Sequence, residues 1–268
     1  WCRCFFLPGV PYEMRRMMMR AVVPAIGERS TGAGEKLVFL EKRFSLFGLP
    51  EAHVNERLAD LAEMIGDVRM GMLAEFPVIH VKLSAHGPDA AHMEAAIDRA
   101  SALVRGRIGE YVFSENSETM ETVVGGLLKA RSSTLSVAES CTGGLIAHRL
   151  TNVAGSSEYF RLSAVAYAND AKIGILAVSP ETIERYGAVS EETAREMAKG
   201  VRRVSGADYG LSVTGIAGPG GGSVQKPVGT VCIGICGPSG TWSRKLTTPF
   251  TERLANKRIF TEAALDDL

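Results

Sequence analysis

Cysteine is scarce in this sequence: five residues among 268, none of them in a Cys-x-x-Cys pair. This scarcity argues against a disulfide-stapled scaffold and a zinc ribbon, and it makes a reducing, cytoplasmic location the expected one. Long apolar runs are missing too, since no stretch approaches the ~18 residues that a membrane-spanning helix needs. We therefore expect no membrane partner.

An excess of charge of either sign is also lacking. Thirty Lys and Arg residues balance thirty Asp and Glu residues, and the pI is near 7.1. A neutral chain has no overall field that draws it to nucleic acid or an anionic membrane, although a local basic patch is still compatible with this balance. Apolar residues are abundant at 46%, enough for a sizeable core, and the length suggests one to three domains.

Residues 1–34 form the first of three stretches. They predict a strand at residues 4–7, a Pro-Gly turn, a helix from Met14 to Val23 and a break at residues 31–34. Four methionines in that helix are interpreted as packing residues for core or interface surface rather than as soft ligands. Because the chain starts at Trp1 without a signal-peptide layout, we expect this stretch to be the end of a longer unit.

Residues 35–114 predict a small α+β unit. A strand begins at Leu37, an amphipathic helix follows Pro50, and apolar and polar residues alternate in a second strand at residues 79–84. A second amphipathic helix is expected from Asp89 to Arg107, and a short strand at residues 111–113 closes the unit.

The tetrad Gly106-Arg107-Ile108-Gly109 fits the GxxG loop of an RNA-binding KH domain. A four-residue pattern is weak evidence, and the end of a helix explains these glycines better. We therefore do not expect nucleic-acid binding, and RNA binding through this unit is kept as an alternative.

Residues 115–268 alternate strands with helices and place glycines at strand ends, which is typical of an α/β fold. A hairpin across Pro238-Ser239-Gly240 makes the predicted sheet mixed rather than purely parallel. The expected architecture is a three-layer α/β/α domain with a mixed sheet, preceded by the small α+β unit.

Ser140 lies in the sharpest local motif, Ala138-Glu139-Ser140-Cys141-Thr142-Gly143-Gly144, at a predicted strand-to-helix turn. Backbone N–H groups at a helix N-terminus bind phosphates or developing oxyanions, so a hydroxyl placed there is a candidate nucleophile. A plain serine cap is the alternative. Cys141 is a rival nucleophile, but no histidine stands where it would activate the thiol, so a packed thiol is favoured.

Lys172 is the candidate base, because no histidine is placed for a Ser-His-Asp triad and lysine replaces histidine in known variants. It follows a predicted strand end, where the rim of an α/β active site is expected. Its pKa must fall through burial or neighbouring positive charge. Tyr167, five residues earlier, is a candidate to hold or relay the proton. A solvated lysine at a helix start is the alternative.

Two further features suit a nucleotide. The glycine-rich run from Thr214 to Gly222 offers bare backbone to a phosphate or ribose, with a flexible lid as the alternative. Arg253, Lys257 and Arg258 are expected on one helical face and could bind an anion, or form a solvated face.

Six motifs occur in an order that resembles the C-terminal domain of the CinA family, the nicotinamide mononucleotide deamidases, also called competence/damage-inducible proteins. The resemblance covers residues 117–268 nearly end to end. Residues 35–114 are similar, more weakly, to the KH-type domain of this family, and residues 7–14 resemble the end of its molybdopterin-binding-like N-terminal domain. The motifs are Ala138 to Gly144, Gly155-Ser156-Ser157, Tyr167 to Lys172, Gly187 to Glu192, Val213 to Gly221 and Lys226 to Val231.

The resemblance implies hydrolysis of the carboxamide of nicotinamide mononucleotide to nicotinate mononucleotide and ammonia, without metal or cofactor, by a homodimer. Ser140 would be the nucleophile, Lys172 the base and Tyr167 its partner. The alternative is a regulatory protein, linked to competence or DNA damage, that binds a pyridine nucleotide without turning it over. The residues implied to line the substrate are Glu139, Cys141, Thr142, Gly143, Thr214, Gly215, Gly218 and Arg253.

The sequence departs from the family pattern in two places. Thr251-Glu252-Arg253 replaces the usual Gly-Asp-Arg, and Ala168 replaces a serine after Tyr167. Neither change touches the proposed catalytic groups. A second family activity, cleavage of ADP-ribose, belongs to the N-terminal domain, so we expect this chain to lack it; release of AMP from ADP-ribose would contradict that.

Overall fold

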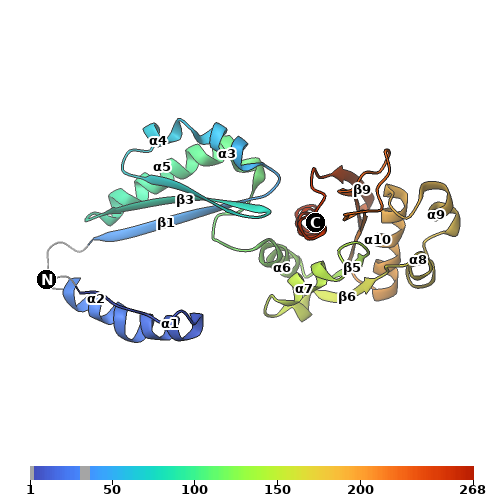
Figure 1. Cartoon of the computed structure of the whole chain (residues 1–268), viewed down its shortest axis with the longest axis horizontal. Helices are drawn as coiled ribbons and strands as arrows, with labels where there is room; N and C mark the ends of the chain where they lie inside the picture. Colours follow the sequence, from blue (N-terminus) through green and yellow to red (C-terminus); the bar gives the residue numbers. More distant parts are fainter. Residues whose placement is uncertain (1–2, 31–36) are drawn as a thin grey trace.

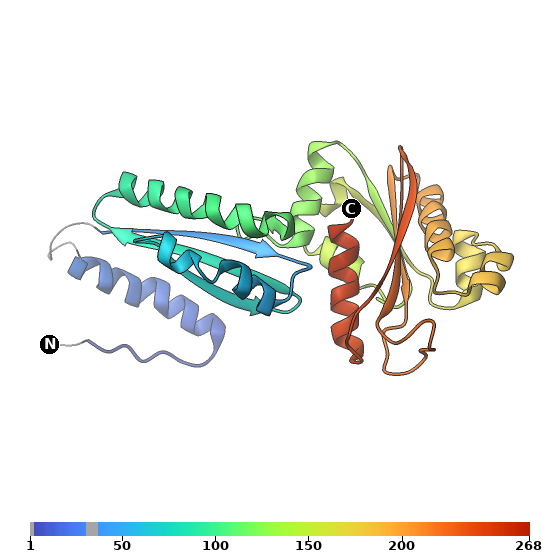
Figure 2. The same cartoon turned by 90° about the horizontal axis from the view of Figure 1, so that it is seen from above.

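The computed structural model describes residues 3–30 and 37–268, and it contains two β-sheets that lie in separate units along the long axis (Figures 1 and 2). The predicted break at residues 31–34 lies outside the described residues. Within the described part, no helix is long and apolar enough to cross a bilayer.

The N-terminal segment differs from its prediction. Residues 3–10 form no strand, since nothing in the described part pairs with them and an unpaired strand is unstable. The helix is longer than expected, running through α1 (Pro11–Met17), the π-helical turn η1 (Met18–Val22) and α2 (Val23–Ser30). Pro24 lacks an N–H donor, which explains the wider turn directly before it. Among the residues of this helix whose burial the structure describes, Val22 alone is buried, while Met17 and Met19 are exposed.

The first sheet is antiparallel, in the order β2-β3-β1-β4. In β3 the apolar residues Ile79, Val81 and Leu83 point inward as the alternation predicted, and they pack against the covering helix α5. The elements are β1 (Val38–Leu46), α3 (Glu51–Leu58), α4 (Leu61–Met64), β2 (Arg69–Glu75), β3 (Val78–Gly87), α5 (Ala90–Ile108), η2 (Gly109–Tyr111) and β4 (Val112–Ser114).

The glycine tetrad at residues 106–109 lies at the end of α5 and the start of η2. It therefore marks a helix C-terminus, as favoured above, and not a loop between two helices. The helix expected after Pro50 is interrupted between Leu58 and Leu61, so that it is two short helices instead of one.

The second sheet is mixed, in the order β6-β5-β7-β8-β9. β5 pairs in parallel with β6 and β7, whereas β8 runs antiparallel to both of its neighbours. The predicted hairpin joins β8 to β9. The strands are β5 (Leu135–Glu139), β6 (Phe160–Val165), β7 (Tyr209–Gly215), β8 (Thr230–Gly237) and β9 (Gly240–Thr247).

Helices cover both faces of this sheet, which confirms the three-layer α/β/α arrangement (Figure 2). α10 packs on one face with α8 and α9 beside it, while α6, α7 and α11 lie on the other. The helices are α6 (Met120–Ala130), α7 (Leu145–Thr151), η3 (Ser156–Glu158), α8 (Asn169–Leu176), α9 (Pro180–Tyr186), α10 (Glu191–Ser205) and α11 (Arg253–Asp266).

Candidate functional site

Ser140 directly follows β5, at the carboxyl end of the parallel strands. Its backbone N–H donates to the carbonyl of Val213 on β7 at 3.0 Å, so the residue is held as an extension of the sheet. The chain then turns through Gly143 and Gly144, both at positive φ, before α7 begins at Leu145. The helix thus begins later than the sequence predicted. Only 8% of the Ser140 surface is exposed, so its hydroxyl is presented from a tight, largely enclosed turn.

Glu139, expected in the substrate site, instead caps α7. Its buried carboxylate accepts from the backbone N–H groups of Gly144 at 2.9 Å, Ile146 at 3.2 Å and Ala147 at 2.9 Å. A carboxylate at this place satisfies the unpaired donors and the positive end of the helix dipole. The carboxylate therefore fixes the Ser140 turn, and contact with a ligand is not open to it.

Lys172 and Ser140 meet inside the protein. The Lys172 Nζ donates to Ser140 Oγ at 3.0 Å and to the backbone carbonyls of Ala166 at 2.8 Å and Tyr167 at 3.2 Å. Lys172 is only 1% exposed, although it belongs to the first turn of a surface helix. The two carbonyls lie in the segment after β6, the strand next to β5, and they aim the amine at the serine hydroxyl.

Burial lowers the pKa of the Lys172 ammonium, because its charged form is poorly solvated there. Among the described residues, no carboxylate forms an ion pair with it. Burial also raises the pKa of the neighbouring Cys141 thiol to about 12. A lysine whose proton is easily lost therefore faces a serine, while the cysteine beside that serine stays a neutral thiol.

Two backbone donors follow Ser140 in the turn. In the described part of the chain, no oxygen accepts from the N–H of Cys141 or Thr142, whereas the N–H of Gly143 donates to the carbonyl of Ser140 at 3.1 Å. The Gly143 N–H is therefore occupied, which leaves the N–H groups of Cys141 and Thr142 as possible donors to a ligand. The Thr142 hydroxyl is buried, and in the described part of the chain it has no hydrogen-bond partner.

Tyr167 and Arg253 form a clasp that was not expected. The Arg253 guanidinium donates to the Tyr167 hydroxyl at 2.7 Å and to the carbonyl of Gly218 at 3.0 Å. The Tyr167 side chain is 60% exposed, and only its backbone carbonyl contacts Lys172. The lysine was predicted to contact the Tyr167 phenol, but it contacts the Tyr167 backbone carbonyl instead. The phenol binds Arg253.

The glycine-rich run contributes backbone rather than side chains. The buried Thr214 hydroxyl donates to the carbonyl of Ala188 at 2.7 Å, which ties the end of β7 to the loop after α9. A Cβ on Gly215 would lie 3.1 Å from Cys141 Sγ, which places this glycine against the Ser140 turn. Lys226 donates to the carbonyl of Tyr186 at 2.6 Å and ties the exposed loop to the end of α9.

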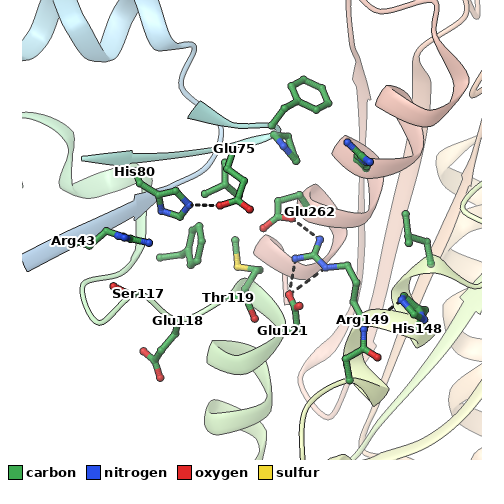
Figure 3. Close-up of a pocket in the computed structure, with 18 residues that line it drawn as sticks. Arg43, Glu75, His80, Ser117, Glu118, Thr119, Glu121, His148, Arg149 and Glu262 are labelled. Atoms are coloured by element: carbon green, nitrogen blue, oxygen red, sulfur yellow. Dashed lines mark hydrogen bonds and ion pairs between the residues drawn. The ribbon is translucent and has the colours of Figure 1, made fainter. Parts of the chain in front are cut away.

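The cations of α11 divide between two places. A Cβ on Gly143 would lie 3.5 Å from the Lys257 Nζ, so Lys257 borders the Ser140 turn, while Arg253 reaches Tyr167 and Gly218. Arg258 instead lines a separate cavity between the two units (Figure 3). The spacing of the three residues indicated a common face, but adjacent helix positions point about 100° apart.

Ala166 was not predicted to belong to the site, although its carbonyl accepts from the lysine amine. A backbone acceptor leaves no mark on residue type, so no signal could have shown it. Among the residues that the structure describes, no cluster of His, Cys, Asp and Glu could hold a metal ion.

The comparisons with known proteins give matches along almost the whole chain. A family model described as "CinA C-terminal domain" matches residues 117–268, and one described as "Damage-inducible protein CinA KH domain" matches residues 41–114. A "CinA-like protein" of Desulfosudis oleivorans is 48% identical over 267 residues, covering 100% of this chain. One from Geobacter sulfurreducens is 43% identical, covering 99%. The chain spans 64% and 63% of the lengths of these relatives.

Two solved structures resemble the C-terminal unit. The competence/damage inducible protein CihA from Agrobacterium tumefaciens is 39% identical, with a TM-score of 0.54, covering 55% of this chain and 90% of that one. A competence-damaged protein from Escherichia coli is 30% identical, with a TM-score of 0.53, covering 57% and 92%.

Proposed function

The chain belongs to the CinA family, and from this premise we propose that it hydrolyses the carboxamide of nicotinamide mononucleotide to nicotinate mononucleotide and ammonia. The observation that carries the proposal is the buried contact of 3.0 Å between Lys172 Nζ and Ser140 Oγ. A serine paired with a desolvated lysine is an arrangement for acyl transfer, of which amide hydrolysis is one case.

In the first step, the neutral Lys172 amine takes the hydroxyl proton as Ser140 Oγ attacks the carboxamide carbon. The pyridinium ring withdraws electrons and makes this carbon electrophilic. The N–H groups of Cys141 and Thr142 are the donors we assign to the developing oxyanion, and one such donor is typically worth ~3 kcal/mol. The resulting ammonium of Lys172 is stabilised by the carbonyls of Ala166 and Tyr167.

In the second step, Lys172 returns the proton to the leaving nitrogen, and the C–N bond breaks to release ammonia. An acyl ester on Ser140 remains. Water, deprotonated by the same amine, then attacks the ester and releases the carboxylate, which restores the serine hydroxyl. Every proton transfer in this mechanism passes through the Lys172 Nζ. A second acid or base is therefore not required.

The cations at the rim suit the phosphate of the substrate. Lys257 borders Gly143, and Arg253 holds the clasp with Tyr167. Either cation can donate a hydrogen bond to a phosphate oxygen. Arg253 would then bind the phosphate anion in place of the neutral Tyr167 phenol. A nucleotide would thus open the clasp as it binds.

Ammonia release from nicotinamide mononucleotide by the purified chain tests the proposal. Ser140→Ala and Lys172→Ala should each abolish turnover, while Lys199→Ala, an exposed lysine of α10, should not change it. Turnover that survives in Ser140→Ala would place the nucleophile elsewhere. A folded wild type that binds the nucleotide without releasing ammonia would favour the regulatory alternative.

The homodimer and the cytoplasmic location stay predictions. Light scattering coupled to size-exclusion chromatography measures the first directly, through the molar mass of the eluting species.

A further inference from the structure

Asn256, in the first turn of α11, is a buried polar side chain that the mechanism above does not use. It is 0% exposed. Its amide nitrogen donates to two backbone carbonyls, that of Ala217 at 3.0 Å and that of Phe250 at 2.8 Å. Its amide oxygen accepts from the hydroxyl of Thr248. Because both carbonyls require a donor, these contacts also fix which amide atom is the nitrogen.

The partners of Asn256 belong to two segments that are distant in sequence. Ala217 lies in the glycine-rich run after β7, whereas Thr248 and Phe250 lie between β9 and α11. The two segments also contact each other, since the backbone N–H of Thr248 donates to the carbonyl of Gly229 at 3.0 Å. One amide thus joins both segments to the start of α11.

Arg253 binds the next carbonyl of the glycine-rich run. It precedes Asn256 by three residues, so the two side chains share a face of α11. Asn256 holds the carbonyl of Ala217, and Arg253 donates to the carbonyl of Gly218 at 3.0 Å. The second contact of Arg253 is the Tyr167 hydroxyl at 2.7 Å. When a phosphate replaces this phenol, the Gly218 carbonyl is the contact that still directs the guanidinium.

The amide cannot be replaced by an apolar group without moving this carbonyl. Leucine has nearly the size of asparagine but no donor, so it would deprive the buried Ala217 carbonyl of this partner. Such groups are rarely tolerated, and we expect the run to shift until the carbonyl meets water. The Gly218 carbonyl would shift with it. A ligand would then have to order the Arg253 guanidinium as it binds, which lowers affinity.

We propose that Asn256 is a positioning residue for the phosphate of the substrate and acts through Arg253. This inference rests on the proposed function, in which Arg253 donates to that phosphate. Within the described residues, the hydrogen bonds of the Asn256 side chain do not reach Ser140 or Lys172. Loss of the amide should therefore weaken phosphate binding and leave the chemical step unchanged.

Isothermal titration calorimetry on the whole chain carrying Ser140→Ala tests this, with nicotinamide mononucleotide as the probe. Adding Asn256→Leu should weaken binding roughly tenfold, the cost of ordering one long side chain. Thr261→Val is the matched control, because Thr261 is equally buried on the same helix and its hydroxyl has no partner in the described part of the chain. This control should leave the affinity unchanged.

Kinetics on chains that retain Ser140 separate positioning from general loosening of the fold. Asn256→Leu should raise KM for the mononucleotide with kcat unchanged. It should not alter kcat/KM for nicotinamide riboside, which lacks the phosphate. A variant that merely loosens the fold would affect both substrates equally.

A double variant shows whether the effect passes through Arg253. Arg253→Gln should itself weaken binding of the mononucleotide, and Asn256→Leu added to it should weaken binding no further, since residues that act through one contact are not additive. Thr248→Val removes only the donor to the amide oxygen. It is the milder variant, and it should weaken binding in the same direction. Thermal melts confirm that each variant is folded.

Three results would overturn the inference. These are unchanged affinity in the folded variants at Asn256 and Thr248, equal losses for the mononucleotide and the riboside, and additive losses in the double variant. Failure of the proposed function is distinguishable, because a wild type that binds the mononucleotide without releasing ammonia still yields the affinity ratios. No binding of the mononucleotide to Ser140→Ala would refute both.

Discussion

At the scale of single residues, the environment of Lys172 decides when it can act as a base. Burial lowers its pKa below the ordinary 10.5, so the neutral amine is present at lower pH than in an exposed lysine. The same shift affects stability. Above pH 10.5 the amine is neutral in both states, and as the pH falls toward the native pKa the unfolded chain binds the proton first, which lowers the free energy of unfolding.

We therefore predict that kcat/KM for ammonia release rises with pH and reaches a plateau at an apparent pKa below 10.5, because only the unprotonated lysine accepts the serine proton. Initial rates measured from roughly pH 6 to pH 10 would show this limb. A profile that is flat throughout, or that falls as pH rises, would speak against Lys172 as the base. Lys172→Arg, which keeps the charge but cannot lose its proton, serves as the control.

Cys141 gives a second prediction at this scale. With a pKa of about 12 and 5% exposure, its thiol should carry ~10⁻⁴ thiolate at pH 8 and should not react with iodoacetamide. The exposed Cys4 should react. Peptide mass spectrometry after alkylation identifies the modified residue, and turnover should be unchanged. Alkylation of Cys141 with loss of turnover would identify it as the nucleophile.

At the scale of elements, two adjacent glycines of α6 differ in what surrounds them. A Cβ on Gly125 would lie 2.7 Å from the hydroxyl of the buried Tyr159, whereas Gly126 faces open space. We predict that Gly126→Ala raises the free energy of unfolding by about 1 kcal/mol, the difference in helix propensity. Gly125→Ala should lower it by about 1–3 kcal/mol through overpacking.

Urea unfolding of the two alanine variants measures both changes from the shift in midpoint at constant slope. The variants are matched in helix, chemistry and position, so propensity contributes equally to each. Equal midpoints would mean that Tyr159 moves aside at no cost.

Elements with strong local signals were predictable from the sequence. The alternation at Ile79 to Leu83 identified β3. β2 was missed because Arg69–Glu75 is rich in methionine and contains a glycine but no β-branched residue. Asn169 and Asp170 begin α8, where an acidic residue in the first turn suits the helix dipole.

The pairing of Ser140 with Lys172 was also predictable, because both follow the carboxyl ends of neighbouring parallel strands. The directions of Glu139 and Thr214 were not. Both residues lie at strand ends beside the site. The sequence does not show that the Glu139 side chain caps α7 or that the Thr214 side chain donates to a loop carbonyl. Long-range partners such as Arg253 and Tyr167 leave no local trace.

At the scale of the whole molecule, the Ser140 site lies entirely within one unit. The residues that form it lie between Glu139 and Lys257. Among the described residues, Phe47 and Phe113 of the first unit also pack against the core of this unit, and both are partly buried. The proposed boundaries at residues 34/35 and 114/115 place all of this machinery in residues 115–268.

We predict that a fragment of residues 115–268 folds and releases ammonia at a rate within about twofold of the whole chain, since preorganised groups keep their geometry. The match to the Agrobacterium structure covers 55% of this chain but 90% of that protein's chain. That structure therefore consists almost entirely of a unit like this one. Circular dichroism and the ammonia assay test the fragment. A folded but inactive fragment would show that the first unit contributes to the site.

Helix α11 has a consequence for how the protein is made. Phe260, Ala263 and Leu265 fill the core beneath the second sheet, so this core is complete only after residue 265 has left the ribosome. The first unit draws its own core from Phe44 to Ile108 and can fold while the rest is still being translated. Until α11 arrives, β7 and β8 have one apolar face uncovered, and the growing chain is then most in need of a chaperone.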